Sequence, residues 1–298
     1  MVGQPAPTEG RGYNRGRARS GCSLGRGRWL AARPRVEQPA PTEGRGYGPA
    51  RMTLVKICGL RDAETALEAA KAGADFIGIM FAESKRKVTP QQCYDIVEAL
   101  KEKRTQGRDA SFDGPQRGDV SAKSWFGAWA DEIEQSAARW RPLIVGIFAD
   151  MEVDDVNNIA DAAGLDFVQL SGGESAEFAA RVHLPVIRAI HVGPETTEFD
   201  VWDAATPGTS AGIMLDTASA DARGGTGEAF DWSVAQEVAR RTPFFLAGGL
   251  TPENVAAAVG QVEPWAVDVS SGVETDGIKD IEKIRAFIRA AKGVRIGR

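Results

Sequence analysis

The chain has 298 residues, a hydrophobic content of 43% and a formal net charge of −5, so it can bury one large core or two small ones. No apolar run approaches the ~20 residues that span a bilayer, and the polar, arginine-rich N-terminus has no signal-peptide segment. Three cysteines without metal-ligand spacing and only two histidines argue against a disulfide framework or a histidine-based metal site. We therefore expect a cytoplasmic protein that binds no membrane, no metal and no cofactor.

The first 51 residues differ in composition from the rest. They carry ten arginines and three glutamates, a charge of +7, which leaves −12 for the remainder. The segment Gln4–Tyr13 recurs letter for letter as Gln38–Tyr47, and no periodic apolar pattern accompanies it. We predict a disordered extension over 1–51, which is either a tail or upstream sequence translated because the start lies at Met52. An Arg/Gly-rich arm for nucleic acid is the alternative, although the acidic remainder argues against nucleic-acid binding.

Eight apolar runs of four to six residues follow, and helical patterns separate them. The runs are continuous rather than alternating, as expected of strands that are buried on both faces. They are Val55–Cys58, Phe76–Phe81, Ile144–Phe148, Phe167–Leu170, Val186–Ile190, Gly212–Leu215, Phe244–Ala247 and Ala266–Val269.

The segments between these runs carry helix start and stop signals. Thr89-Pro90 and Thr251-Pro252 predict N-caps followed by proline at the first helical position, and Gly164 predicts a helix end. Cys93 falls on the apolar face of the helix after Thr89, so we assign it to packing. Residues 52–298 number 247, close to the ~250 of a (β/α)8 TIM barrel, which is the predicted α/β fold. A doubly wound open sheet is the alternative, but the first strand lacks a Gly-rich dinucleotide turn.

One stretch, at about 101–141, does not fit the repeat. Lys101–Lys123 is polar and predicts a loop, whereas Ala128–Trp140 has a helical apolar pattern. We expect this insertion to dock as an extra helix on the stability face of the barrel, away from the chemistry. A helix that binds a partner is the alternative.

Cys58 ends the first apolar run, and Gly59 and a helix capped by Asp62 follow it. A strand that ends in a thiol before a tight turn is how α/β folds present reactive groups. A buried structural cysteine is the alternative, because free cysteine is among the most buried residue types. This segment alone leaves both interpretations open.

Asp216 directly follows the sixth apolar run. A carboxyl at the end of a buried strand is partly desolvated, which raises its pKa and lets it hold a proton as a general acid. An aspartate that only caps a turn is the alternative.

Three glycine-containing segments follow the last three strands: Gly224–Gly227, Gly248-Gly249 and Ser270–Gly272. Glycine lets backbone N–H groups approach a ligand, and the loops after strands 7 and 8 are the usual phosphate site of a barrel. The cations Lys85–Lys87 after the second strand would attract a further anion. A thiol, an acid, a cationic loop and a phosphate site together suit proton transfers on a small phosphorylated, anionic compound.

These residues resemble those of phosphoribosylanthranilate isomerase. The resemblance covers about residues 53–292 except the insertion, and the chain departs from it at Ser171, where the family usually has histidine. The segments that carry it are Lys56–Gly59, Ser84–Arg86 with Val88, Val145–Phe148, Val168–Leu170, Leu215-Asp216, Gly224–Gly227, Phe230–Trp232, Leu246–Leu250, Val267–Glu274 and Lys279-Asp280.

The resemblance implies the Amadori rearrangement of N-(5-phosphoribosyl)anthranilate in tryptophan biosynthesis, by a monomer or homodimer. It assigns the general acid to Asp216, the general base to Cys58 and the anthranilate carboxylate to Arg86. Because a free thiol keeps its proton at neutral pH, we expect nearby cations to favour the thiolate of Cys58. The remaining predicted substrate contacts are Gln169, Gly225, Thr226, Gly248, Gly249, Ser270, Ser271 and Gly272.

Two other functions remain open at this stage. A related histidine-pathway isomerase acts on a similar aminoaldose with the same fold, but that family has aspartate at the end of its first strand, where this chain has Cys58. An enzyme that accepts both substrates is a variant of that alternative. A nucleic-acid binder without enzymatic activity would depend on residues 1–51 alone.

Overall fold

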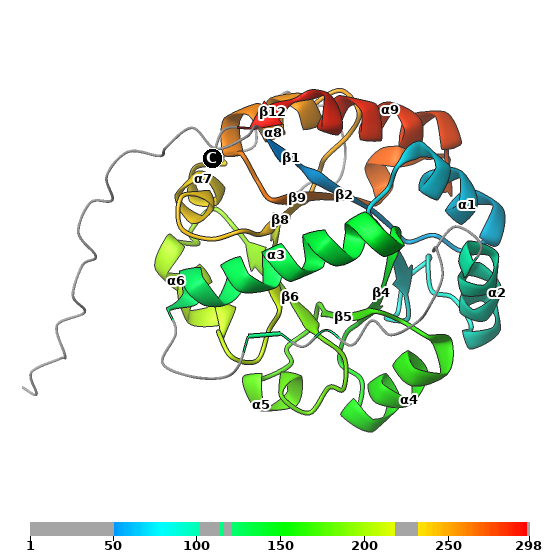
Figure 1. The fold of residues 1–298 in the computed structure, drawn as a ribbon, viewed down its shortest axis with the longest axis horizontal. Coiled ribbons are helices and arrows are strands. Elements are labelled where there is room, and N and C mark those ends of the chain that lie inside the picture. The colour runs from blue at the N-terminus through cyan, green and yellow to red at the C-terminus, as the bar shows by residue number, and fades with distance from the viewer. Residues whose placement is uncertain (1–50, 102–111, 113, 116–120, 218–231, 297–298) are drawn as a thin grey trace, which may run out of the picture. The chain divides into compact units, whose positions relative to one another are not determined.

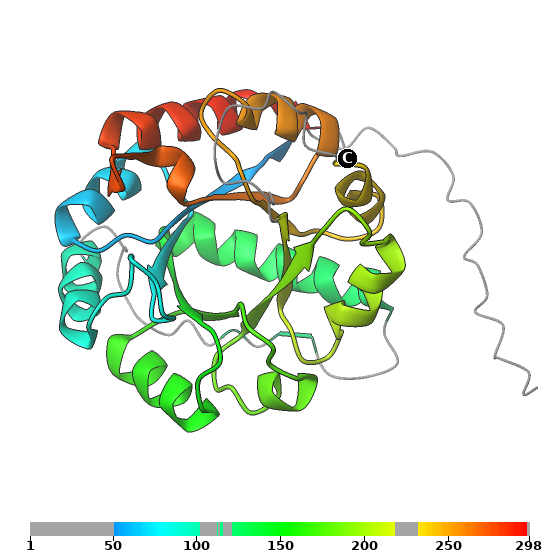
Figure 2. The same ribbon diagram turned by 180° about the vertical axis from the view of Figure 1, so that it is seen from behind.

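The computed structural model describes residues 51–101, 112, 114–115, 121–217 and 232–296. Within them, eight parallel strands form a closed barrel in chain order (Figures 1 and 2). This confirms the predicted barrel, and each predicted run is one of its strands, with bounds that move by at most two residues. The strands are β2 (Leu54–Cys58), β3 (Phe76–Met80), β4 (Leu143–Phe148), β5 (Phe167–Leu170), β6 (Val186–Val192), β7 (Gly212–Thr217), β8 (Phe245–Ala247) and β9 (Ala266–Val269).

Helices surround the barrel, so each strand is buried on its outer face as well as its inner face (Figure 1). This double burial explains why the strand sequences are continuous apolar runs. Cys93 lies in α2 at 0% exposure, and its assignment to packing is confirmed. The surrounding helices are α1 (Ala63–Ala72), α2 (Pro90–Lys101), α4 (Val153–Ala163), α5 (Ala176–Ala179), α6 (Glu198–Ala205), α7 (Ser233–Ala239), α8 (Val255–Val262) and α9 (Ile281–Gly293).

Most of the predicted helix ends agree with the structure. The Asp62 side chain accepts a hydrogen bond from the Thr65 N–H at 2.8 Å and caps α1, and Gly164 ends α4 with a φ of 68°. The start predicted at Thr251-Pro252 is wrong, because α8 begins at Val255. The Asn254 side chain accepts the Thr251 N–H at 2.8 Å, which makes residues 252–254 a turn ahead of the helix.

The insertion carries one helix, α3 (Ala122–Trp140), which begins six residues earlier than predicted. The Ser121 side chain accepts a hydrogen bond from the Ser124 N–H and caps the helix. This cap is not evident from the sequence, because the residues before it are also polar. The Trp125 indole donates to the Ser210 carbonyl at 2.6 Å, and the Trp265 indole donates to Glu134 at 2.7 Å. These contacts place α3 across the amino ends of the strands, where Figures 1 and 2 show it crossing one end of the barrel. The helix therefore docks on the amino-end face of the barrel, which is the face predicted for the insertion.

A short antiparallel pair joins the two ends of the described chain. Strand β1 (Arg51–Met52) pairs with β12 (Arg295–Ile296), so the ordered structure includes residue 51. The rest of the predicted extension, residues 1–50, lies outside the described residues. None of the helices in the described ranges is long and apolar enough to cross a membrane.

We expect a deletion of residues 1–50 to leave the Tm and kcat/KM nearly unchanged, because that sequence has no apolar pattern with which to build a core. Thermal melting and steady-state kinetics would measure both quantities. A deletion extended through Met52 is the matched comparison, since it also removes β1, and it should have the larger effect on the Tm. A large loss in the shorter deletion would contradict the predicted disorder.

Candidate active site

The predicted catalytic residues lie at the carboxyl ends of the barrel strands. Cys58 is the last residue of β2, and Asp216 is the last but one of β7. Cys58 pairs with Gly78 of β3, where an added Cβ would lie 3.0 Å from the Cys58 Sγ. Gly78 therefore provides the space that the thiol occupies, a role that a glycine inside an apolar strand can indicate.

The Cys58 thiol is 4% exposed. Burial raises its pKa above the ordinary value, the charge of Asp268 raises it further, and the ammonium groups of Lys56 and Lys279 lower it. The expected cations are present and favour the thiolate, as predicted, but burial outweighs them and the pKa of Cys58 is raised overall.

The Asp216 carboxyl is partly desolvated, as predicted, with its side chain 42% exposed. Burial is the largest cause that raises its pKa, and the charge of Asp268 adds to it, whereas His191 and Lys56 act in the opposite direction. The predicted rise is confirmed, so Asp216 is suited to hold a proton.

His191 is a neighbour of Asp216 that the sequence reasoning missed. It stands opposite Asp216 in the β6–β7 pair, with its Nδ1 3.9 Å from the Asp216 Oδ2. Its Nε2 lies 3.2 Å from the Ser171 carbonyl oxygen. The sequence offered one indication of this position, because His191 directly follows the predicted strand Val186–Ile190. Within the described part of the chain, no group of three or more His, Cys, Asp or Glu could hold a metal ion.

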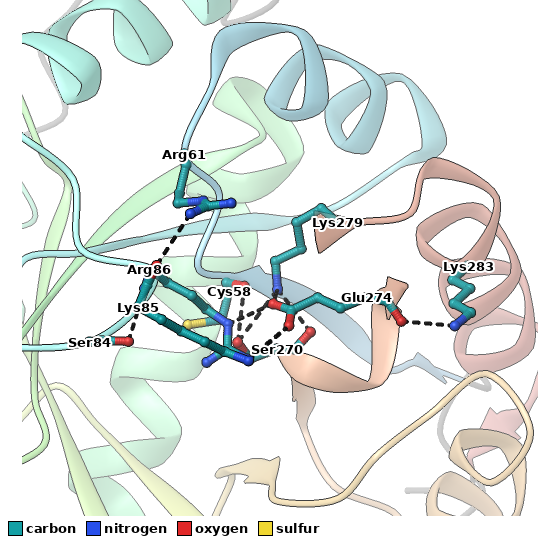
Figure 3. Close-up of polar contacts among 9 residues, drawn as sticks. All are labelled: Cys58, Arg61, Ser84, Lys85, Arg86, Ser270, Glu274, Lys279 and Lys283. Carbon is teal, nitrogen blue, oxygen red and sulfur yellow. Dashed lines mark hydrogen bonds and ion pairs between the residues drawn. The ribbon is translucent and has the colours of Figure 1, made fainter. Parts of the chain in front are cut away.

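A charge cluster surrounds Arg86 beside the thiol (Figure 3). Arg86 donates from Nε to Glu274 Oε1 at 2.6 Å and from Nη2 to Oε2 at 2.9 Å. Lys279 lies 2.9 Å from the same carboxylate and donates to the Ser270 carbonyl at 2.8 Å. Burial opposes ionisation of Glu274, but the hydrogen bonds from Arg86 and Lys279 outweigh it and lower its pKa to about 2. Glu274 therefore stays ionised and fixes the direction of the guanidinium group.

The turn after β2 allows Arg86 to come close. Gly59 has a φ of 77°, and an added Cβ would lie 2.6 Å from the Arg86 Cδ. The conformation and the space both require glycine here. Gly59 thus brings the predicted carboxylate-binding residue next to the predicted base, Cys58.

Gln169 of β5 is 5% exposed and lies among the inward-facing strand residues. Its Nε2 donates to the Ser171 Oγ at 2.9 Å, and its buried Oε1 has no hydrogen-bond partner among the described residues. The hydrogen bond to Ser171 fixes the amide group and leaves this buried acceptor unused within the described part of the chain.

The glycine loops differ from one another. Gly248 and Gly249 follow β8 with φ values of 91° and 63°, and an added Cβ on Gly249 would meet no heavy atom within 4 Å. At Gly272, by contrast, an added Cβ would lie 1.9 Å from the Leu250 carbonyl oxygen, so packing alone requires glycine there. Ser271 begins a short 3₁₀ helix, Ser271–Val273. The predicted contacts Gly225 and Thr226 lie outside the described residues.

The sequence reasoning also missed an ion pair inside the barrel. The Lys56 Nζ is 2.8 Å from the Asp268 Oδ1, and the two residues are 0% and 7% exposed. The sequence does indicate this pair, because β2 and β9 each carry one charged residue in an otherwise apolar run. Closure of the barrel makes these first and last strands neighbours.

Known proteins with similar sequences are named as N-(5'-phosphoribosyl)anthranilate isomerases or as tryptophan biosynthesis proteins. The family model for N-(5'phosphoribosyl)anthranilate (PRA) isomerase matches residues 103–290. The N-(5'-phosphoribosyl)anthranilate isomerase of Dehalococcoides mccartyi is 39% identical over 246 residues, which cover 81% of this chain and 96% of that protein. The multifunctional tryptophan biosynthesis protein of Phycomyces blakesleeanus is 41% identical over 263 residues, which cover 83% of this chain but only 34% of that longer protein.

Solved structures agree with this result. The phosphoribosyl anthranilate isomerase of Thermotoga maritima is 33% identical with a TM-score of 0.60, and the match covers 82% of this chain and all of that one. A structure of the isomerase in complex with reduced 1-(o-carboxyphenylamino)-1-deoxyribulose 5-phosphate is 31% identical with a TM-score of 0.59, at the same coverage. The sequence match and the arrangement of the barrel agree with the resemblance drawn from the motifs, and the chain belongs to the N-(5'-phosphoribosyl)anthranilate isomerase family.

Proposed function

We propose that this chain converts N-(5-phosphoribosyl)anthranilate into 1-(2-carboxyphenylamino)-1-deoxyribulose 5-phosphate, with Asp216 as the general acid and Cys58 as the general base. The observation that carries the proposal is the placement of a buried thiol and a carboxyl with a raised pKa at the same end of one barrel. The reaction needs one group that gives a proton and another that takes one, and these two groups have suitable chemistry.

In the first step, Asp216 protonates the ring oxygen of the ribose. The bond between this oxygen and C1 breaks, and the nitrogen lone pair forms an iminium ion with C1. A carboxyl group can act in this way only while it holds its proton, and the burial that raises the Asp216 pKa supports that state.

In the second step, the Cys58 thiolate removes the proton from C2, which the adjacent iminium has made acidic. The electrons of the C2–H bond form the C1–C2 double bond and neutralise the nitrogen. Loss of the C2 hydroxyl proton and addition of a proton at C1 then give the ketone, so substrate and product have the same composition. No redox cofactor enters this balance.

Two anionic ends of the substrate have separate anchors in this proposal. Glu274 engages the Nε and Nη2 of Arg86, which leaves Nη1 to bind the anthranilate carboxylate. The 5′-phosphate lies against the loop at Gly248 and Gly249, where the lack of side chains lets an anion approach the backbone N–H groups. Gln169 accepts from a ribose hydroxyl.

We expect Gly249→Ala to raise KM about tenfold or more with a smaller change in kcat, because the side chain would stand where the phosphate approaches the backbone N–H groups. Steady-state kinetics with the phosphorylated substrate would measure both constants. Gly260→Ala is the matched control, since an added Cβ there also meets nothing within 4 Å but lies in α8. Unchanged KM in Gly249→Ala would contradict this placement of the phosphate.

The activity itself is tested by following the fluorescence of the anthranilate derivative during incubation with purified protein. Substrate consumption, with the expected product in the mass spectrum, is the result that supports the proposal. A parallel assay with the histidine-pathway aminoaldose separates a specific enzyme from one that accepts both substrates. Turnover of that compound alone would overturn the proposed substrate.

A further inference from the structure

The Lys56–Asp268 ion pair has no role in the proton transfers described above. Lys56 is fully buried, and its Nζ lies 2.8 Å from the Asp268 Oδ1. Removing two charges from water has a large free-energy cost, and apolar side chains of similar size often give equal or greater stability. The presence of this buried pair inside the barrel therefore calls for another explanation.

One end of the pair lies close to the base. Lys56 precedes Cys58 by two residues in β2, so both side chains point to the same face of the strand. Lys56 also stands opposite Asp268 in the β2–β9 pair, and its ammonium group interacts with both that carboxylate and the Cys58 thiol. The ammonium is the largest of the charge effects that lower the Cys58 pKa.

The other end of the pair extends towards the acid. Asp216 stands opposite Ala247 in the β7–β8 pair. Leu246 stands opposite Val267 in the β8–β9 pair, so Ala247 and Asp268 come next in the same row. Ala247 is therefore the one residue between Asp216 and Asp268 along this row. The charge of Asp268 is accordingly the largest charge effect on the Asp216 pKa, and it raises that pKa.

We propose that Lys56 and Asp268 are positioning residues for the two proton transfers: the ammonium stabilises the thiolate of Cys58, while the carboxylate keeps the proton on Asp216. This inference rests on the roles given to Cys58 and Asp216 under the proposed function. Those roles require a protonated carboxyl and a deprotonated thiol, the reverse of the ordinary order of their pKa values. When the two pKa values move one unit closer together, the fraction of enzyme in the active form rises about tenfold.

Other charges face the same two groups. Lys279 and Arg86 also act on the thiol, and both are paired with Glu274. His191 acts on Asp216 and lowers its pKa. Each member of the Lys56–Asp268 pair also acts on the other group in the opposite direction, because Asp268 raises the Cys58 pKa and Lys56 lowers the Asp216 pKa. In both cases the favourable effect is the larger one, since Lys56 has the largest charge effect on Cys58 and Asp268 has the largest on Asp216.

The test is a titration of the Cys58 thiol in the full-length protein by NMR of 13Cβ-labelled cysteine, with assignments from Cys22→Ser and Cys93→Ser. Lys56→Met should raise the pKa of Cys58 and reduce its thiolate fraction at neutral pH about tenfold or more, whereas Asp268→Asn should lower that pKa. The double variant should raise it less than Lys56→Met does. Because the double variant removes both buried charges, it tests the proposal even where a single substitution prevents folding.

The matched control is the Lys292–Asp75 pair, in which Asp75 is buried and the Nζ–Oδ2 distance is 2.7 Å. Asp75 precedes β3 at the amino end of the barrel, so Lys292→Met with Asp75→Asn should leave the Cys58 titration unchanged. Equal titrations in all variants, shifts in the same direction for both single substitutions, or an equal shift in the control would overturn the proposal. The titration needs no substrate, so its failure is distinct from a failure of the proposed activity.

Discussion

Cys58→Ser is expected to lower kcat by at least ~10²–10⁴-fold, the range that a general base contributes. Serine has nearly the same shape, but its hydroxyl keeps its proton far more tightly than a thiol does, so little base is available to remove the C2 proton. KM should change much less, because the thiol anchors neither the carboxylate nor the phosphate. Fluorescence assays across a range of substrate concentrations would separate the two constants.

Cys93→Ser and Cys22→Ser are the matched controls, because each makes the same chemical change at another position. Cys93 is fully buried in α2, and burial raises its pKa to about 12, so its substitution should affect the Tm rather than kcat. Near wild-type turnover by Cys58→Ser would show that the thiol is structural. That outcome would support the packing interpretation, which the strand-end position alone leaves open.

The barrel was predictable because burial on both faces leaves a strong signal in each strand. Runs such as Phe167–Leu170 have no polar alternation, and their bounds in the structure match the prediction. Helix starts were less predictable, since they depend on one side-chain hydrogen bond each. Thr251-Pro252 has the usual sequence of a cap, yet the Asn254 side chain forms a turn there and delays the helix.

Single residues at strand ends were predictable where their chemistry is unusual for their position. Cys58 and Asp216 belong to this class, and the direction of the Asp216 pKa followed from burial alone. The balance at Cys58 was not predictable, because burial and two cations act in opposite directions and only their distances decide the sum. Sequence patterns contain the charges but not these distances.

Contacts between segments that are distant in the sequence were the features that could be predicted least. Lys56 and Asp268 are 212 residues apart in the sequence, and only closure of the barrel brings them together. The sequence assigns Gly272 to phosphate binding because glycine lets backbone N–H groups approach a ligand. The structure adds a packing reason that the sequence cannot contain, namely the carbonyl of Leu250.

Asp216→Asn should lower kcat to a similar extent as Cys58→Ser, because the amide keeps the shape of the carboxyl but cannot protonate the ring oxygen. The pH dependence of kcat/KM gives a more specific test. Carboxyl groups ordinarily titrate near 4 and thiols near 8.5, and burial raises both here. The active form with a protonated carboxyl and a thiolate is therefore a minor form, and its fraction is constant between the two macroscopic pKa values.

Wild-type kcat/KM should accordingly form a plateau that falls on the acid side of the lower pKa and on the alkaline side of the higher one. In Asp216→Asn only the thiol still titrates. The residual kcat/KM should then rise about tenfold per pH unit across the former plateau until the thiol is ionised, and it should not fall at higher pH. Asp203→Asn is the control, since that aspartate lies in α6 on the outside of the barrel and should keep the wild-type profile. A bell-shaped profile in Asp216→Asn would show that another group supplies the proton, and His191, 3.9 Å away, would be the first residue to substitute next.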